Sequence, residues 1–313
     1  MKTSAMKIKQ IVFAAGILAL AATLPGTALA GLFQPGEILL NEYSSSSVQR
    51  YSATGTLLQT FTGTGTFWAG AALTPDGNLV TAYRVPSAGI DIFSPAGTQL
   101  ASFAVAGIGT VNDVSVFPDG TLALCVGNDN TVQFWSQTGV LGTTVVLPGV
   151  NIPGGSTVGS DGILYLAGSG SNNLARVSAG GVSLGNVSLS FAPGDLVMNP
   201  VDGTLWVSAA RTGLVEHITT TGTVLGSFAT GLSGTFNGIG LAPDDNSLYV
   251  TSTGSTVVKH FDLSGGLLGS FALTSPKNPF YLTVVPNPVP EPATLAVGLL
   301  CLGVGMARRR RSV

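Results

Sequence analysis

The chain has 313 residues, of which 45% are hydrophobic and only 9% are charged, and it contains 43 glycines. This composition is typical of an all-β protein outside the cytoplasm and disfavours a cytosolic enzyme. Between residues 31 and 290 there are 6 Lys and Arg against 14 Asp and Glu, a net charge of −8, which disfavours nucleic acid as a partner.

The first thirty residues have the pattern of a secretory leader. A basic start with three lysines leads into an apolar run over residues 11–24, and an Ala-x-Ala site ends at Ala30. This order predicts that 1–30 is a signal peptide, removed by signal peptidase during export. A retained membrane anchor is the alternative.

From residue 31 onwards the chain repeats a unit of four short apolar runs separated by turns. The clearest copy is Ile239–Phe271, whose turns read Pro-Asp-Asp-Asn, Thr-Gly-Ser and Ser-Gly-Gly. Its last run begins at a glycine that recurs at intervals of 42, 42, 42, 41 and 43 residues, at Gly55, Gly97, Gly139, Gly181, Gly222 and Gly265. Runs this short and rich in Val, Leu, Tyr and Phe indicate strands. Six copies at this period predict an all-β fold, a six-bladed β-propeller of four-stranded antiparallel blades.

The repeat array begins with an incomplete unit and ends with the strand that completes it. Three predicted strands near the start have no innermost strand before them: Glu37–Asn41, Val48–Tyr51 and Gly55–Phe61. The missing strand is Tyr281–Val285, since Pro286 follows its counterpart Pro243 by 43 residues. We therefore predict that residues 31–285 form one propeller. Its ring closes by pairing of the C-terminal inner strand with the N-terminal strands, which removes the open edge.

Two further patterns accompany the repeat. The turn Pro-Asp-Gly, the strand Leu-Tyr-Val and the third strand Val258–Asp262 resemble the repeats of NHL-type propellers, over Glu37–Val285. That resemblance supports the fold and does not indicate a ligand. Aspartates recur in the first turn of the unit, and we interpret them as caps of hairpin turns: Asp76, Asp119, Asp161, Asp202 and Asp244.

The histidines and cysteines are not expected to form a reactive site. Alignment of the third strands puts six residues in one position, Arg50, Ile92, Phe134, Arg176, His217 and His260. This position is far from the axis of a propeller, so both histidines are predicted to be structural or surface residues. Cys125 lies in an apolar strand and is predicted to be inert core, while Cys301 lies in the tail, so the ring has no disulfide.

Residues of different blades meet around the central axis, just before each innermost strand. The sequence places three aromatic and four polar residues there: Trp68, Phe236, Phe280, Asn112, Asp113, Asp195 and Asn237. We predict that they form a ligand-binding mouth in which the aromatic rings stack on a sugar or a partner's side chain. The alternative is that they are ordinary loop residues around a water-filled channel.

Part of this rim resembles a known metal site. Val111–Asp113 and Phe236–Gly238 are similar to the rim motifs of six-bladed lactonases and gluconolactonase-like hydrolases. In that family a Glu, an Asn and an Asp hold one divalent cation, which implies calcium at Asn112, Asp195 and Asn237. The chain departs from the pattern, because Ala69 and Phe280 stand where the Glu is needed and Asp195 is one residue out of phase. We therefore expect no catalytic residue, metal or cofactor, and keep a metal-dependent hydrolase as the alternative.

The C-terminal region combines three unlike features in a fixed order. A proline-rich spacer over residues 286–292 contains Pro290, Glu291 and Pro292, and an apolar segment follows in 293–313. Four arginines stand close to the end: Arg308, Arg309, Arg310 and Arg311. The region closely resembles the PEP-CTERM sorting signal of Gram-negative bacteria that make exopolysaccharide, and this resemblance implies that an exosortase reads the Pro-Glu-Pro motif.

The apolar segment is short for a membrane anchor. Ala293–Ala307 spans 15 residues. As a helix this is about 22 Å long against about 30 Å of bilayer core. We expect a transmembrane helix that holds the chain transiently, with the arginines on the cytoplasmic side. An ordinary tail anchor is the alternative.

These features together predict a protein exported through the inner membrane to the cell surface or the extracellular space. We expect a non-enzymatic binding or scaffold module of the envelope or exopolysaccharide matrix. Its expected partners are signal peptidase, exosortase, the membrane before processing, and an exopolysaccharide or an envelope or matrix protein.

Overall fold

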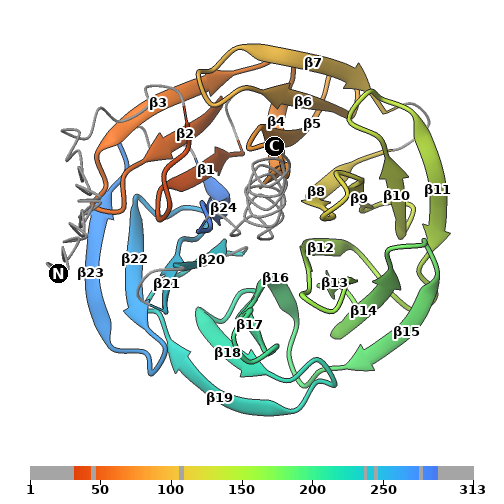
Figure 1. Ribbon diagram of the computed structural model, residues 1–313. Coiled ribbons are helices and arrows are strands. Elements are labelled where there is room, and N and C mark those ends of the chain that lie inside the picture. Colours follow the sequence, from red (N-terminus) through yellow and green to blue (C-terminus); the bar gives the residue numbers. More distant parts are fainter. Residues whose placement is uncertain are drawn as a thin grey trace, which may run out of the picture. The chain divides into compact units, whose positions relative to one another are not determined.

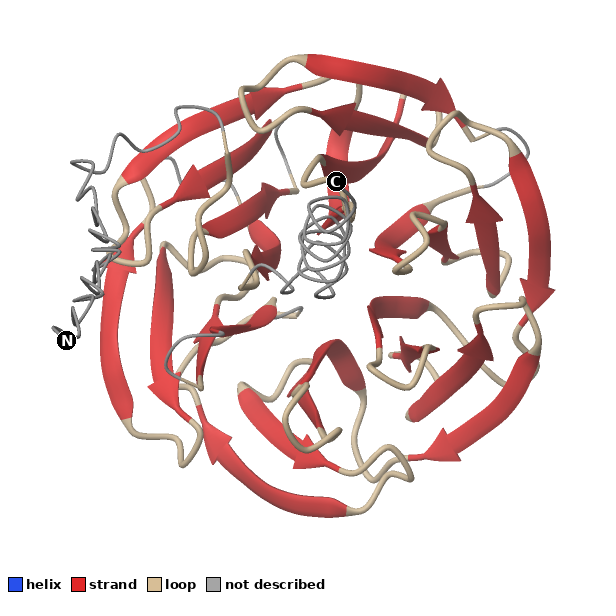
Figure 2. Cartoon of the chain, in the orientation of Figure 1, coloured by secondary structure: helices blue, strands red, loops and turns tan. Residues whose placement is uncertain are grey.

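The computed structural model describes residues 32–287 except 44–46, 106–108, 236–237, 243–245 and 275–277, and in Phe67 and Trp68 it describes the backbone alone. Within these residues the regular structure consists of 24 β-strands in six four-stranded sheets. The sheets follow one another around a central axis as the blades of a propeller (Figures 1 and 2). This arrangement confirms the predicted all-β fold and blade number.

Five blades are built from four consecutive strands, ordered from the axis outwards. The first three are β4 (Thr66–Leu73), β5 (Leu79–Val85), β6 (Gly89–Phe93), β7 (Gln99–Ala104); β8 (Val111–Val116), β9 (Leu122–Val126), β10 (Thr131–Trp135), β11 (Leu141–Val146); and β12 (Pro153–Val158), β13 (Ile163–Gly168), β14 (Asn173–Ser178), β15 (Ser183–Ser188). The other two are β16 (Pro193–Met198), β17 (Leu205–Ala209), β18 (Leu214–Ile218), β19 (Val224–Ala229); and β20 (Ile239–Ala242), β21 (Ser247–Val250), β22 (Val257–Asp262), β23 (Leu267–Ala272).

The remaining blade joins the two ends of the propeller. Its order is β24 (Pro279–Val284), β1 (Ile38–Glu42), β2 (Ser47–Tyr51) and β3 (Leu57–Thr62). Strand β24 pairs antiparallel with β1, with Ile38 opposite Val284 and Leu40 opposite Leu282. The backbone N–H of Val285 also donates to Glu37 O at 2.8 Å. The predicted ring closure is therefore confirmed, and it leaves no innermost strand missing from this blade.

The hydrophobic core lies between neighbouring blades. The cluster between the β4–β7 blade and the β8–β11 blade combines Val80 and Ile90 with Val114 and Leu124, all buried. Strand β9 is buried throughout, whereas β11 at the outer edge of the same blade is exposed at all positions except Val145. Because a buried Val or Leu contributes about 1.5–3 kcal/mol, each blade is stabilised mainly by its neighbours.

Three of the four described aspartates of the first turns act as predicted. The Oδ1 atoms of Asp119, Asp161 and Asp202 accept the backbone N–H two residues further on, at 2.9, 3.0 and 2.9 Å. The glycine after Asp119 has a φ of +87°, which an L side chain rarely adopts. Asp244 lies outside the described residues. In the turn with Asp76, the N–H of Asn78 donates to Thr74 Oγ1 at 3.0 Å instead. The other three turns support the structural interpretation of these carboxylates.

The six third-strand residues aligned by sequence do share one register position. Arg50, Ile92, Phe134, Arg176, His217 and His260 pair with the same position of their second strands, at Leu39, Val80, Ala123, Tyr165, Trp206 and Tyr249. His217 and His260 stack on Trp206 and Tyr249, each with 4.1 Å between ring centroids. Both histidines thus pack within their own blades and are structural residues, as predicted.

Cys125 is a fully buried free cysteine, and burial raises the pKa of its thiol well above the ordinary value. This confirms its assignment to the core. The predicted signal peptide, the spacer after Asn287, the apolar segment and the arginine cluster lie outside the described residues. Within the described part of the chain, no helix has the length and apolarity needed to cross a membrane.

Candidate functional site

The innermost strands share a register position next to the axis. Each second strand has one residue that pairs with the third-strand position described above. The next residue of that second strand pairs with a residue of the innermost strand: Ala71, Val114, Ser156, Leu196, Ile239 and Leu282. The residues directly before these six are Gly70, Asp113, Gly155, Asp195, Gly238 and Tyr281. We call this set the axial circle. Around the ring it alternates a glycine with a large polar side chain.

Close packing requires the alternation. A Cβ atom added at Gly70 would lie 1.5 Å from Asp113 Oδ1, and one at Gly155 would lie 2.1 Å from Asp195 Oδ1. These distances are far shorter than any van der Waals contact, and both glycines precede their aspartates by one blade. Each aspartate therefore occupies the space that the missing side chain of the previous blade leaves.

Each aspartate also bonds to the next blade. Asp113 Oδ2 accepts the N–H of Ser156 at 2.6 Å and its hydroxyl at 2.7 Å. Asp195 Oδ2 accepts the N–H of Ile239 at 3.1 Å, and its Oδ1 accepts the N–H of Leu196 at 2.8 Å. The two carboxylates thus fasten β8 to β12 and β16 to β20.

The axial circle is electrostatically unusual. Burial raises the pKa of Asp113 to about 7. Burial, and then the charge of Asp113, raise the pKa of Asp195 well above its ordinary value. Burial and both carboxylates likewise raise the pKa of the Tyr281 hydroxyl. The three large residues of the circle therefore influence one another across the axis, and ionisation of all of them is disfavoured.

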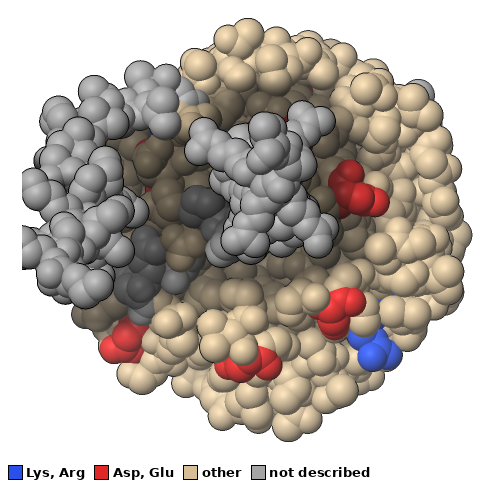
Figure 3. Space-filling view, in the orientation of Figure 1, with Lys and Arg blue, Asp and Glu red and all other residues tan. Residues whose placement is uncertain are grey.

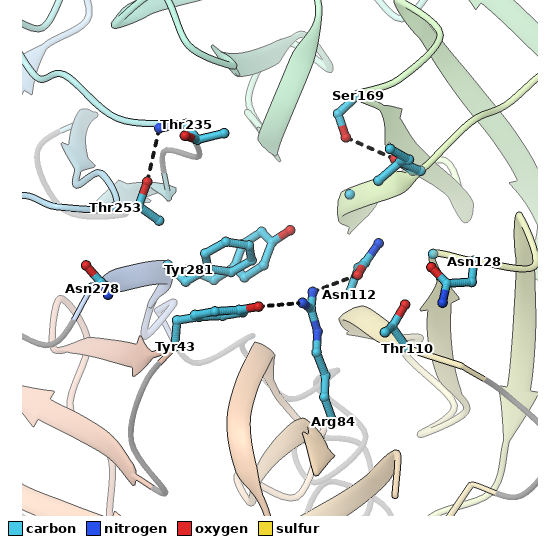
Figure 4. A pocket seen from close by; sticks show the side chains of 14 residues that line it. Tyr43, Arg84, Thr110, Asn112, Asn128, Ser169, Thr235, Thr253, Asn278 and Tyr281 are labelled. Atoms are coloured by element: carbon cyan, nitrogen blue, oxygen red, sulfur yellow. Dashed lines mark hydrogen bonds between the residues drawn. The ribbon is translucent and has the colours of Figure 1, made fainter.

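A cavity of about 510 Å³ opens at the end of the ring where the innermost strands begin, and we call it the mouth cavity. It is lined by the starts of innermost strands and the loops before them, and by the ends of second strands and the loops after them (Figure 4). Tyr281 lines both this cavity and a second one of about 380 Å³, which runs along the innermost strands and contains Asp113 and Asp195. The axial circle therefore borders both cavities, with Tyr281 at the mouth cavity and all three of its large side chains at the second one. A volume of this size is in the range of small-molecule sites, about 300–1,000 Å³.

Arg84 is the charged residue of the mouth cavity, since every other described lining residue is neutral. Its Nε donates to Val111 O at 2.9 Å, and its Nη2 donates to Asn112 Oδ1 at 2.7 Å. Its Nη1 donates to the hydroxyl of Tyr43 at 3.3 Å (Figure 4). The guanidinium carbon lies 5.3 Å from the ring centre of Tyr43 and 5.8 Å from that of Phe280, within the range of cation–π attraction. The side chain is thus held from several sides.

The structure places the described residues of the predicted mouth in two layers. Asn112 and Phe280 line the mouth cavity, whereas Asp113 and Asp195 lie one layer deeper in the axial circle. Trp68 belongs to β4, but its side chain is not described, and Phe236 and Asn237 lie outside the described residues. Whether these residues bind a ligand stays a prediction.

Sequence reasoning missed three residues of the cavity, Tyr43, Arg84 and Tyr281. Tyr43 follows β1 and Arg84 lies near the end of β5, both of them second strands, whereas the predicted mouth comprised only residues close to the start of innermost strands. The available signal was that Arg84 is one of only six Lys and Arg residues between 31 and 290.

The described donor atoms do not fit the calcium site implied by the lactonase resemblance. The side-chain oxygen of Asn112 already accepts from a guanidinium cation, and its amide nitrogen donates to Pro153 O at 2.6 Å. Both carboxylate oxygens of Asp195 are bonded to backbone N–H groups. Among the described residues no group of three or more His, Cys, Asp and Glu could hold a metal ion. A hard cation needs several convergent oxygens, and the adjacent Arg84 opposes one.

The face of the ring drawn in Figure 3 carries few charged side chains where it is described. Most of its surface is neutral, with separate acidic residues towards the lower rim. No broad basic patch is visible on the described part of this face.

No protein-family model matches the sequence, and no curated protein matches it. Among solved structures, the chain is similar to a protein of unknown function from Bacteroides caccae, with 14% identity, a TM-score of 0.64, and coverage of 80% of this chain and 99% of that one. A functionally unknown protein from Desulfotomaculum acetoxidans gives 16% identity, a TM-score of 0.63, and coverage of 82% and 87%. Virginiamycin B lyase from Staphylococcus aureus gives 17% identity, a TM-score of 0.56, and coverage of 68% and 73%. At these identities the similarity establishes the propeller fold alone.

Proposed function

We propose that the chain is an exported binding module that holds a polysaccharide, or an envelope or matrix protein, at the mouth cavity. The observation that carries this proposal is the cavity of about 510 Å³, bordered by aromatic rings, neutral polar groups and one fixed guanidinium. Aromatic faces pack on sugar rings and apolar side chains, while amides and hydroxyls confer specificity. The acceptor and donor atoms that would orient a ligand come from several blades.

A binding role is favoured over a lyase reaction. A virginiamycin B lyase from Staphylococcus aureus is catalytically inactive when one histidine is replaced by alanine. The present chain has two histidines in all, and both lie in third strands, stacked on Trp206 and Tyr249. Neither lines the mouth cavity, so no histidine is in position to act on a ligand there.

The hydrolase alternative has less support than binding. A lactonase-type reaction at this rim would require a divalent cation, and the described donor atoms of Asn112 and Asp195 are already used within the protein. We therefore propose no catalytic step.

The cavity assignment is tested by filling it. Asn128 is an exposed lining residue, so Asn128→Trp should place an indole in the cavity without disturbing the core. Thr138→Trp is the matched control, because Thr138 is exposed in the turn after β10 and does not line the cavity. Capture of the host's exopolysaccharide and matrix proteins by the purified protein should fall at least tenfold in Asn128→Trp and stay unchanged in Thr138→Trp. Equal capture by both variants and the parent would contradict the proposed site.

We also propose the route by which the protein reaches the envelope. The leader over residues 1–30 and the motif Pro290-Glu291-Pro292 support cleavage by signal peptidase and then processing by an exosortase in a Gram-negative host. Replacement of the three motif residues with alanine should leave the protein uncleaved in the inner membrane. Fractionation of host cells followed by mass measurement checks this, and normal processing of the variant would refute the motif.

A further inference from the structure

The positive charge of the mouth cavity, on Arg84, forms no salt bridge with a described residue. The one salt bridge within the described part of the chain joins Arg50 to Glu37, at 2.7 Å. Arg84 is instead surrounded by a carbonyl, an amide, a phenol and two aromatic rings. A partly buried cation among neutral groups attracts an anion more strongly than an exposed one does, because water screens it less.

The guanidinium keeps part of its bonding capacity. It has five N–H donors, and the protein uses one on Nε, one on Nη1 and one on Nη2. One N–H therefore remains on each terminal nitrogen. An N–H of this kind donates a charge-assisted hydrogen bond to a carboxylate oxygen, which is stronger than a bond between neutral groups.

The other lining groups indicate what carries the carboxylate. Six neutral hydroxyl and amide side chains border the cavity: Thr110, Asn128, Ser169, Thr235, Thr253 and Asn278. The rings of Tyr43, Phe280 and Tyr281 border it as well, with Phe280 and Tyr281 in edge-to-face contact at 4.5 Å between centroids. Hydroxyl and amide groups beside aromatic faces suit a sugar, which presents hydroxyls at its edge and C–H groups on its face. From these groups together we infer that the mouth cavity binds an acidic sugar, with its carboxylate on Arg84.

The charge of residues 31–290 restricts how such a ligand approaches. Residues 31–290 carry a net charge of −8, so a long acidic polymer is repelled along most of the surface. The positive charge of Arg84 favours a single acidic sugar that enters the cavity, and such a sugar stands at an end of the polymer. This inference rests on the proposed function and names the ligand class for the same site: the acidic end of an extracellular polysaccharide.

The experiment measures binding of the host's exopolysaccharide in its native form and after chemical reduction of its carboxylates to alcohols. The variant is Arg84→Gln, which removes the charge and keeps a side chain of hydrogen-bonding type. Arg176→Gln is the control, because it makes the same change in net charge at a third strand, where Arg176 donates to Leu184 O at 3.1 Å. Circular dichroism and thermal melting establish that both variants are folded. Free glucuronate and free glucose serve as competitors, and a glutamate-rich peptide serves as the alternative ligand.

We expect the parent and Arg176→Gln to bind the native polymer at least tenfold more tightly than the reduced one, since charge-assisted bonds exceed neutral ones by about this factor. Arg84→Gln should bind the two forms alike, and glucuronate should compete better than glucose. Equal binding of native and reduced polymer by the parent would overturn the acidic-sugar inference and leave the proposed binding function standing. Binding of neither form would overturn both, and tighter binding of the peptide than of the polymer would overturn the choice of a sugar.

Discussion

Two circles of residues occupy equivalent positions in every blade, one far from the axis and one beside it. The outer circle is the third-strand set, Arg50, Ile92, Phe134, Arg176, His217 and His260. Its polar members find partners close by in sequence or in their own blade: Arg50 pairs with Glu37, His217 stacks on Trp206, and His260 stacks on Tyr249. The polar contacts of this circle are therefore local to each blade.

The axial circle behaves differently, because its members interact from blade to blade. Asp113 occupies the space beside Gly70 and bonds to Ser156, so three blades decide its environment. Its charge also raises the pKa of Asp195 and Tyr281, which belong to other blades. A substitution at the third-strand position should therefore affect its own blade, whereas a substitution in the axial circle should affect several blades.

The largest expected effect is removal of the strand that supplies Tyr281 to the axial circle. Deletion of Phe280–Val285 takes away most of β24, breaks the pairing with β1 and exposes its edge. The variant should lose cooperative unfolding or aggregate. Calorimetry checks this, and a melting curve like that of the parent would contradict the described closure.

A single methyl group at the axial circle should also be costly. Gly155→Ala would put a Cβ 2.1 Å from Asp195 Oδ1 and 2.6 Å from its Cα, so backbone must move. We expect a loss of about 3 kcal/mol, at the upper end for overpacked cores. Urea unfolding measures it.

The matched control is Gly226→Ala in β19, where an added Cβ meets nothing within 4 Å. Its stability should stay within about 0.5 kcal/mol of the parent, as for most surface changes. Similar losses in the two variants would refute the close packing assigned to the axial circle.

The pH dependence of stability should come largely from the same circle. Asp113 has a pKa of about 7 in the folded protein, against 3.8 ordinarily, so the folded state binds the extra proton between these values. Its contribution is complete below pH 3.8, is lost as the pH rises towards 7, and is constant above. Asp195 and Glu216 shift in the same direction, through burial above all.

Thermal melting from pH 4 to pH 8 should therefore show a falling midpoint, with an effect on the order of a few kcal/mol. Asp113→Asn keeps an acceptor for Ser156 and should flatten the decline. Asp202 and Asp262 have pKa values lowered from 3.8, so their contributions are lost below the tested range. A decline as steep in Asp113→Asn as in the parent would show that other groups cause it.

The smallest expected effect belongs to the outer circle. His217→Gln removes a ring stacked on Trp206 with planes 6° apart, and a stacked pair contributes about 0.5–1.5 kcal/mol. Stability should fall by about 1 kcal/mol, while binding of the host polysaccharide stays at the parent's level. A large loss of binding would place function at the third strands.

The same contrast explains what could be predicted from the sequence. The blade count and the ring closure follow from spacing, because each turn and strand is specified by its own residues, such as Asp119 and its glycine. The third-strand circle was found in the same way. Arg84 and Tyr43 were missed because their importance comes from contacts across 27 to 41 residues, to Val111, Asn112 and each other. The glycines and large polar residues of the axial circle can be found in the sequence. That they alternate at one register position follows only from the pairing of the innermost strands, which contain bulges.

The central claim is that binding chemistry lies at the axis and not on the periphery of the blades. The outermost strands are the competing surface, since they expose large apolar side chains, among them Leu58, Leu100, Leu184, Leu225 and Leu268. Amide hydrogen exchange with and without the host's exopolysaccharide tests the claim most directly. We predict slower exchange in the loops of the mouth cavity, at Thr110, Asn112, Asn128, Ser169 and Thr253, with the outermost strands unchanged. Slower exchange confined to β3, β7, β15, β19 and β23 would contradict the account.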